Sequence, residues 1–426
     1  MDNFFTKSLS LALLTMPAWV LTIHHGASLS AKIILLLSLI ILVFHYPIHL
    51  ALNKKEKIFI FSLICLPVVV AFDVTLRGLN LRYLDYYLRF ILVIPIYFAL
   101  RETKVTMTPL MTGILIGSIG AGIFALYQNY YLNNPSLGKY SSLGYMIKIN
   151  YGNISLLLGM LSLAGLFIIN ELRFKKTFYI ITLLAFILGI TGSLLSGSRG
   201  GWIAIPFCVG LFIMYFPTQK INKIIGTLIF IMAILITYYA NPDVKSRTDL
   251  AYHNTEAYFS NEKTEAVHTS TGARYELWRA AWIMFTEHPV FGIGSGEVRQ
   301  ILKKKIDSGE IKKIKLYDHV HNEPLQILIT TGIVGLSAYL ILYAGISYYF
   351  YRSLITSSIN KVRYLSFLGI MTTGAYFIFG LTNYSFGHHV MVLFFAVMVA
   401  IFAGVISNIE NNKNSSDSIR IFSSLN

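Results

Sequence analysis

Long apolar runs dominate this chain and restrict what it can fold into. Twelve of them are rich in Leu, Ile, Phe and Val and nearly free of charge. About 17 to 25 such residues in a helix span the hydrocarbon core of a bilayer, and a helix satisfies its own backbone hydrogen bonds there. Across the chain 55% of residues are hydrophobic and 13% are charged, which excludes a water-soluble globular domain. The sequence predicts an all-α integral membrane protein.

The predicted transmembrane helices number about twelve. They cover residues 9–25, 31–51, 58–76, 84–100, 106–129, 151–170, 177–196, 201–216, 224–240, 324–350, 364–384 and 389–408. Nine of them fall within residues 1–240 and three within 324–408. Between the ninth and tenth lies a long helical loop domain at 241–323, and a tail follows at 409–426.

Basic residues concentrate in every second connection between the predicted helices. They lie within residues 54–57, 101–104, 173–176, 220–223 and 352–363. Short connections rich in Lys and Arg face the cytoplasm, so both termini are predicted to be cytoplasmic and the loop domain to face the periplasm or the cell exterior. The net charge of +15 largely reflects this bias, and no motif predicts nucleic-acid binding.

Metal, disulfide and dinucleotide chemistry lack the sequence patterns that they require. Cys65 and Cys208 are the only cysteines, and both lie in predicted membrane helices. There is no Asp-x-Asp pair, His/Cys cluster or HExxH motif, so we expect neither a metal nor another cofactor. Residues 292–296, GIGSG, follow no strand, which argues against a dinucleotide fold.

The loop domain divides into three parts. Residues 241–271 are polar and rich in turn-forming residues, and 273–287 have the pattern of an amphipathic helix that Pro289 ends. Its predicted buried positions are Leu277, Ala280, Ala281 and Met284. Residues 299–315 carry seven basic side chains against two acidic ones. They are either a solvated face or a contact for anionic lipid or a phosphorylated glycolipid, made by Lys303, Lys304, Lys305, Lys312 and Lys313.

His321 stands where this polar domain gives way to the next apolar run, and it is the strongest pointer to chemistry. An imidazole pKa near 6.5 suits a general base at neutral pH. Asn322 and His319 lie beside it and offer groups that orient the ring. The alternative is a hydrogen-bonded structural histidine. Gly332 and Gly335, in the following helix, are interpreted as a site where another helix packs closely.

Several arginines are candidates for binding an anionic ligand. Arg199 lies in GSRGG at the outer end of a predicted span, where a guanidinium near hydrocarbon calls for an anionic partner. Arg274 lies near a helix start, where the helix dipole favours acids unless a phosphate is bound. Arg279, Arg82 and Arg89 are weaker members of the same set. The alternative for each is an arginine that reaches the membrane interface.

These motifs resemble those of the bacterial O-antigen ligase family. The family pattern of His-[Asn/Ser/Gln], nine residues and Gly-x-x-Gly is similar to His321-Asn322 followed by Gly332 and Gly335. Residues 272–296, GARYELWRAAWIMFTEHPVFGIGSG, look like the arginine, tryptophan, proline and glycine block that precedes this histidine. Residues 198–201, SRGG, are similar to its other arginine motif. The broader superfamily also includes O-antigen polymerases and protein O-oligosaccharyltransferases.

The resemblance implies a metal-independent, inverting glycosyltransferase at the periplasmic face of the bacterial inner membrane. It implies transfer of a glycan from undecaprenyl pyrophosphate to the lipid A core oligosaccharide, with His321 as the catalytic base and Arg199 and Arg274 as pyrophosphate ligands. An O-antigen polymerase is the alternative with the same donor. A transporter of lipid-linked oligosaccharides is a further alternative, which the lack of internal repeats and the scarcity of charge within the predicted spans disfavour.

Overall fold

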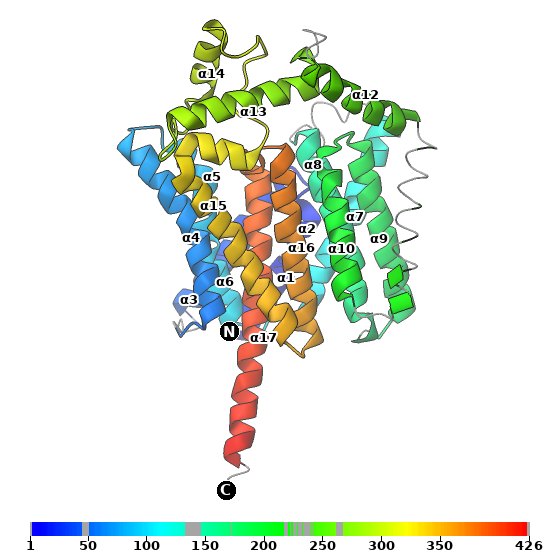
Figure 1. Cartoon of the computed structure of the whole chain (residues 1–426). Helices are drawn as coiled ribbons and strands as arrows, with labels where there is room; N and C mark the ends of the chain where they lie inside the picture. Colours follow the sequence, from blue (N-terminus) through cyan, green and yellow to red (C-terminus); the bar gives the residue numbers. More distant parts are fainter. Residues whose placement is uncertain are drawn as a thin grey trace.

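The structure is an all-helical bundle. The computed structural model describes the backbone of residues 2–44, 51–132, 146–171, 173–216, 242–260 and 267–423, together with isolated positions between 220 and 239. Every secondary-structure element within these ranges is a helix, which confirms the predicted fold class. Helix α13 (Ser270–Glu287) lies across one end of the bundle, and α17 (His389–Ser423) protrudes from the other (Figure 1). We call these the α13 end and the tail end.

Nine segments among the described residues are long and apolar enough to cross a membrane, and each matches a predicted span. They are formed by α3 (Gly26–Phe44), α4 (Lys54–Leu76), α5 with α6 (Arg82–Leu92 and Ile94–Glu102), α7 (Thr108–Leu126), α8 (Lys148–Leu163), α9 (Lys175–Leu195), α15 (Glu323–Thr356), α16 (Asn360–Thr382) and α17. The protein is therefore built as a multi-pass membrane protein.

The other three predicted spans differ. Residues 9–25 do not form one helix, because α1 (Asp2–Ala12) ends before α2 (Thr15–Trp19) begins. Residues 201–216 form the short η3 and α10, which together cover Gly200–Tyr215. Residues 224–240 lie mostly outside the described residues. The count of twelve spans stays a prediction.

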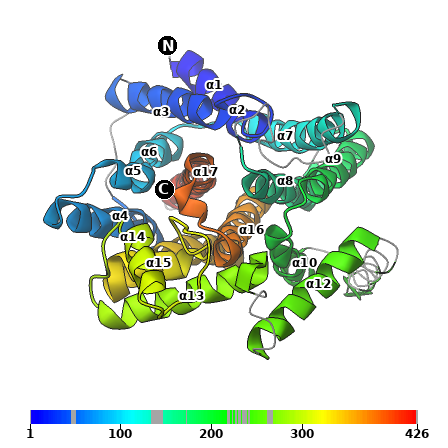
Figure 2. The same cartoon turned by 90° about the horizontal axis from the view of Figure 1, so that it is seen from above.

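Helix α17 forms the centre of the bundle. Its apolar window is 89% buried, the largest share among the membrane-length helices that the structure describes. Seen from above, α3, α5, α6, α4, α15 and α16 surround it (Figure 2). The helix continues to Ser423, past residue 409, where we predicted that the tail begins. The tail is thus helical in backbone over most of its length.

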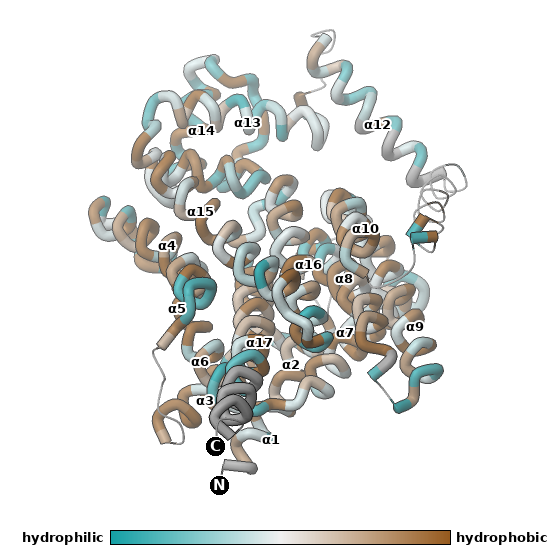
Figure 3. The backbone as a smooth tube through the Cα atoms, turned by 60° about the horizontal axis from the view of Figure 1, so that its bottom comes forward, coloured by the Kyte–Doolittle hydropathy of each residue, from teal (hydrophilic) through white to brown (hydrophobic). Residues whose placement is uncertain are grey.

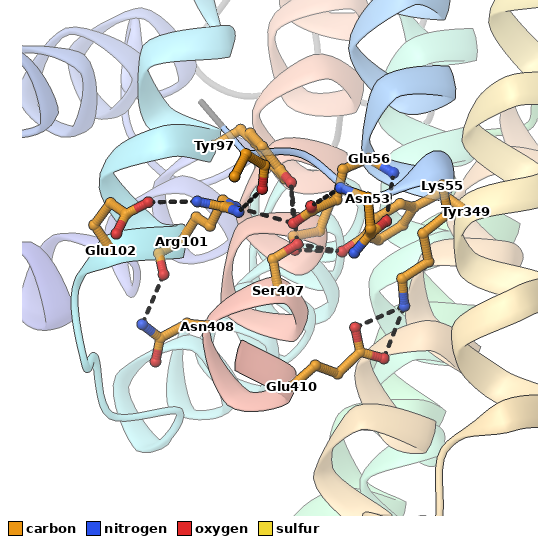
Figure 4. Close-up of polar contacts among 12 residues, drawn as sticks. Asn53, Lys55, Glu56, Tyr97, Arg101, Glu102, Tyr349, Ser407, Asn408 and Glu410 are labelled. Carbon is orange, nitrogen blue, oxygen red and sulfur yellow. Dashed lines mark hydrogen bonds and ion pairs between the residues drawn. The ribbon is translucent and has the colours of Figure 1, made fainter. Parts of the chain in front are cut away.

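A buried polar network fastens the helices together at the tail end. Glu56 of α4 accepts hydrogen bonds from the Tyr97 hydroxyl at 3.0 Å and from Nε of Arg101 at 2.9 Å. Ser407 of α17 lies 3.0 Å from the Tyr97 hydroxyl. Lys55 pairs with Glu410 at 2.6 Å (Figure 4). The network joins α4, α6 and α17 by charge-assisted bonds, which are stronger than neutral ones.

The loop domain at the α13 end has a small core of its own. The helix predicted at 273–287 is α13, and all four of its predicted buried positions are fully enclosed: Leu277, Ala280, Ala281 and Met284. Residues 242–259 correct a sequence interpretation, because this polar stretch, described above as rich in turn-forming residues, is the helix α12 (Pro242–Phe259). The loop domain is more hydrophilic than the bundle (Figure 3).

Candidate functional site

His321 lies in a short connection that both neighbouring residues hold in place. Its backbone has φ 52°, a left-handed conformation that is uncommon for a residue with a side chain. The N–H of Val320 donates to the Gln326 side chain at 3.0 Å, and the Val320 carbonyl accepts from the Trp278 indole at 3.1 Å. Asn322 caps α15 by accepting from Leu325 N–H at 3.0 Å. Strained backbone held by such contacts is typical of functional sites.

An aromatic cluster surrounds the His321 ring. The ring centroid of His319 lies 4.3 Å away and that of Tyr317 5.3 Å away, both edge-to-face. The ring centroids of Tyr384 and His388 lie 5.8 and 6.5 Å from that of His319. The Nδ1 atoms of His319 and His321 are buried without a hydrogen-bond partner among the described residues. The cluster therefore retains hydrogen-bonding capacity for a ligand.

The electrostatics of the site keep these imidazoles neutral. Burial, followed by the neighbouring His319, Arg274 and His388, lowers the pKa of His321 to about 3. Burial and His319 lower the pKa of His388 to about 4, and burial lowers the pKa of His319. A neutral imidazole can accept a proton, which is what a general base requires.

The structure brings Arg274 and Arg199 to the same end of the bundle as His321. Arg274 lies on α13, close enough for its charge to lower the pKa of His321, while burial lowers its own pKa. Arg199 is half-buried in the turn before η3 (Gly200–Ile203).

The final turn of α16 joins the Arg199 turn to the His321 segment. A Cβ at Gly200 would lie 2.5 Å from the Thr382 hydroxyl, so the turn is packed tightly against α16. The Asn322 side chain donates to the Leu381 carbonyl at 3.0 Å. The Arg199 turn and the segment that carries His321 thus both pack against the same end of α16.

A break in α15 locks this helix to the loop domain. Gly332 has φ 66° and ψ −162°, a combination essentially limited to glycine. Backbone hydrogen bonds cross the break, from Ile333 N–H to the Pro289 carbonyl at 2.9 Å, from Ile293 N–H to the Ile329 carbonyl at 2.8 Å and from Gly294 N–H to the Thr330 carbonyl at 2.9 Å. Backbone N–H and carbonyl groups that would form hydrogen bonds within an unbroken helix instead form them with the turn after α13.

The break corrects the sequence interpretation of Gly332. We expected this glycine to admit a neighbouring helix, whereas it admits a loop: a Cβ there would collide with the Val290 carbonyl. At Gly335 a Cβ would collide with Thr331 of the same helix. The glycine motif therefore couples the segment that carries His321 to the helix that carries Arg274.

Glu323 ties the site to the connection between α16 and α17. Its side chain is fully buried, and Oε1 accepts the Phe386 N–H at 2.6 Å. Phe386 lies in η5 (Ser385–Gly387), between Tyr384 and His388. The Oε2 atom has no hydrogen-bond partner among the described residues. Glu323 thus holds the turn that brings Tyr384 and His388 to the site.

The other predicted arginines are engaged in the protein's own contacts to different extents. Arg279 donates to Glu276 at 2.8 Å and to the Glu310 carbonyl at 2.7 Å, so it braces the loop domain. Arg89 is buried and pairs with Asp85 at 2.5 Å. Arg82 is exposed, and with Asp85 and two tyrosines it lines a pocket of about 350 Å³.

The five lysines that were predicted to contact lipid or a glycolipid fall into two groups. Lys303, Lys304, Lys312 and Lys313 are exposed. Lys305 is buried, with its ammonium 2.6 Å from Glu287 and 3.2 Å from Glu310, and these bonds raise its pKa despite burial. Because the ammonium of Lys305 pairs with carboxylates of the loop domain itself, this side chain is not exposed as the other four are. In the part of the chain that the structure describes, no three His, Cys, Asp or Glu side chains form a metal-binding group.

Sequence reasoning missed Tyr384 and His388. Both lie in the connection between the last two membrane helices, more than sixty positions after His321. The available signal was the pair of histidines, His388 and His389, at the start of an apolar run, because titratable groups at such a position are costly and commonly functional.

Comparison with known proteins relates a central part of the chain to a described family. Residues 183–340 match the family described as O-Antigen ligase, and this range contains Arg199, Arg274 and His321. The chain is also 27% identical over 362 residues to an uncharacterized protein of Haemophilus influenzae, an alignment that covers 83% of this chain and 88% of that protein.

Proposed function

We propose that the chain is an O-antigen ligase, and the match of residues 183–340 to the O-antigen ligase family supports this proposal. In this proposal it transfers an O-antigen glycan from undecaprenyl pyrophosphate to the lipid A core oligosaccharide. The reaction takes place at the periplasmic face of the inner membrane, inverts the anomeric centre and uses no metal. The loop domain and the α13 end then face the periplasm.

The proposed chemistry divides between the imidazole and the guanidinium groups. His321 removes the proton from an acceptor hydroxyl as that oxygen attacks the anomeric carbon of the donor. The bond from this carbon to the pyrophosphate oxygen breaks, and the pyrophosphate leaves with the electron pair. Arg199 and Arg274 bind the departing charge, since guanidinium forks match phosphate oxygens. The imidazolium then releases its proton to the leaving pyrophosphate or to solvent.

The observation that carries the proposal is the half-buried His321 ring, with an unpartnered Nδ1, beside Arg274. An empty site leaves this ring a weak base, because burial and, after it, the neighbouring His319 and Arg274 disfavour its protonated form. A bound pyrophosphate offsets the charge of Arg274 and favours the protonated ring. The donor thus raises the basicity of His321 when it is needed.

The decisive experiment combines purified protein with undecaprenyl-pyrophosphate glycan and core lipid A in the absence of divalent metal. Glycan on lipid A supports the ligase. Longer lipid-linked glycans, with none on lipid A, identify a polymerase instead. Movement of the donor across a vesicle membrane without any covalent product identifies a transporter and overturns the proposal.

A further inference from the structure

Large apolar side chains are exposed where the loop domain meets α15. We call them the apolar edge: Trp282, Val290, Phe291, Ile333 and Val334, with 60, 48, 56, 47 and 36% of their surface exposed. The loop domain buries Leu277 and Met284 completely, so apolar side chains left outside its core need another explanation. A contiguous exposed apolar patch marks an interaction surface.

The break at Gly332 brings two parts of this edge together, Val290 and Phe291 of the turn after α13 and Ile333 and Val334 of α15. The hydrogen bond from Ile333 N–H to the Pro289 carbonyl, 2.9 Å long, places the turn after α13 directly against α15. On α13, the Trp282 ring lies 5.6 Å from that of Phe285, which packs on the loop-domain core. The edge is therefore held rigidly and does not belong to a loose loop.

The edge continues a surface that faces lipid. Leu340 and Ile341 of α15 are 47 and 40% exposed, and each follows a member of the edge by seven residues. Seven residues are about two helical turns, so these side chains share one face of α15. Because α15 is long and apolar enough to cross a membrane, this face meets the hydrocarbon. The edge extends it to the underside of α13.

The basic side chain of Arg77 lies at the border of this surface. Arg77 at the end of α4 donates to the carbonyls of Phe291 and Gly292, at 3.1 and 2.8 Å, and pairs with Asp73 at 2.7 Å. About a third of its side chain, 36%, stays exposed. Tryptophan together with a long basic side chain is typical of the membrane interface.

We infer that the apolar edge lies in the outer boundary of the bilayer, with Trp282, Val290 and Phe291 inserted among the lipid headgroups and upper acyl chains. The second half of α13 then rests on the membrane as an interfacial helix. The occupant of the patch is lipid, and neither water nor a second protein covers it.

This placement has a consequence that rests on the proposed function. Arg274 precedes Trp282 by eight residues on α13, about 12 Å along the helix. An interfacial α13 therefore holds Arg274 near headgroup level, where a lipid-linked donor carries its pyrophosphate. The edge sets the height of the site above the membrane.

Depth measurement by spin labelling tests the inference. Cysteine replaces Val290 or Phe291 in a Cys65→Ala, Cys208→Ala background, and the labelled protein is placed in lipid nanodiscs. Collision with oxygen, which concentrates in lipid, is compared with collision with a water-soluble nickel complex. Two controls calibrate the scale: Leu340→Cys on the lipid-facing side of α15, and Phe259→Cys on α12, where the side chain is 69% exposed.

We expect the labels at 290 and 291 to show a depth between the two controls, with oxygen collisions exceeding nickel collisions. Nickel collisions equal to those at 259 would place the edge in water and overturn the inference. Protection from both reagents would show that protein covers it, and would also overturn it. The measurement needs no turnover, so its outcome is independent of whether the protein transfers glycans.

Discussion

A buried carboxylate at one end of the bundle has hydrogen-bond partners for both of its oxygens, whereas a buried carboxylate and an imidazole at the other end keep unpartnered atoms. Near the tail end, Oε2 of Glu56 accepts the Asn53 N–H at 2.8 Å, and Oε1 accepts from Tyr97 and Arg101. At the α13 end, Oε2 of Glu323 and Nδ1 of His321 have no hydrogen-bond partner among the described residues. Both carboxylates are almost completely enclosed, at 1 and 0% exposed.

The difference indicates that buried polar residues serve two purposes in this molecule, holding helices together and binding a ligand. Buried polar atoms are nearly always satisfied, because an unsatisfied one costs roughly 1 to 3 kcal/mol. The Glu56 network obeys this rule and holds helices together. The α13 end departs from it where the backbone is also strained, at His321, and such departures are expected where a ligand binds. Five predictions test this assignment.

Replacing His321 by Ala should have the largest effect, and it should fall on turnover. General-base catalysis contributes typically about a hundred- to ten-thousand-fold, so transfer to lipid A should fall by that factor. Melting in detergent should be almost unchanged, since the ring makes no hydrogen bond through Nδ1. The matched control is His253→Ala on α12, which is exposed. Normal transfer by the His321 variant would remove it from the role of base.

Replacing Glu56 by Ala should do the opposite: it should lower stability and leave transfer unchanged. It leaves the buried Arg101 without one of its carboxylates, and breaking a buried ion pair costs about 3 to 5 kcal/mol. We expect the free energy of unfolding to drop by that amount, with normal transfer per folded molecule. Glu102→Ala is the control, because it keeps the Glu56 contact and should cost less. A catalytic defect in a stably folded Glu56 variant would contradict a purely structural network.

Gly332→Ala should affect both properties. The backbone conformation alone costs about 1 to 3 kcal/mol for a residue with a side chain, and the Cβ collides with the Val290 carbonyl. Because relief of the collision separates α15 from the turn after α13, transfer should fall even where the protein remains folded. Gly210→Ala in α10 is the control, since a Cβ there has nothing within 4 Å. Equal behaviour of the two variants would show that the break is unimportant.

The same comparison explains which parts the sequence predicted. Membrane helices follow from the length of apolar runs, and the buried face of α13 follows from the spacing of Leu277 and Met284, because both are local patterns. The break at Gly332 and the contact of Glu323 with Phe386 are not local: partners 63 residues apart meet only after the bundle forms. The sequence grouped Lys305 with the exposed lysines for the same reason: its carboxylate partners are set by the packing of the loop domain, which is not a local pattern.

Two variants of Glu323 separate positioning from charge. In Glu323→Ala the buried Phe386 N–H loses its acceptor, at a cost of about 1 to 3 kcal/mol, and the turn that carries Tyr384 and His388 should loosen. Glu323→Gln keeps an acceptor oxygen and should retain most transfer. Reactivity of His388 toward diethyl pyrocarbonate gives a second readout, which should rise in the Ala variant alone. Loss of transfer in the Gln variant, with His388 still protected, would assign a role to the carboxylate charge.

Acid sensitivity should also come from the α13 end. The unfolded chain protonates His321 and His388 below about pH 6.5, whereas the folded protein does so only near 3 and 4. Between these values the unfolded state binds more protons, so the free energy of unfolding decreases as the pH falls from 6.5 to 4. Each histidine adds at most about 1.4 kcal/mol per pH unit, and less where solvent screens it.

The double variant His321→Asn, His388→Asn should flatten this slope in melting curves between pH 7 and 4.5, since asparagine does not titrate and tolerates the positive φ at 321. His253→Asn should leave it unchanged. The remaining His319, whose pKa burial also lowers, keeps part of the slope. A slope that persists undiminished in the double variant would assign the acid sensitivity to carboxylates such as those of the tail end. In that case the neutral histidines would not distinguish the α13 end from the rest of the molecule.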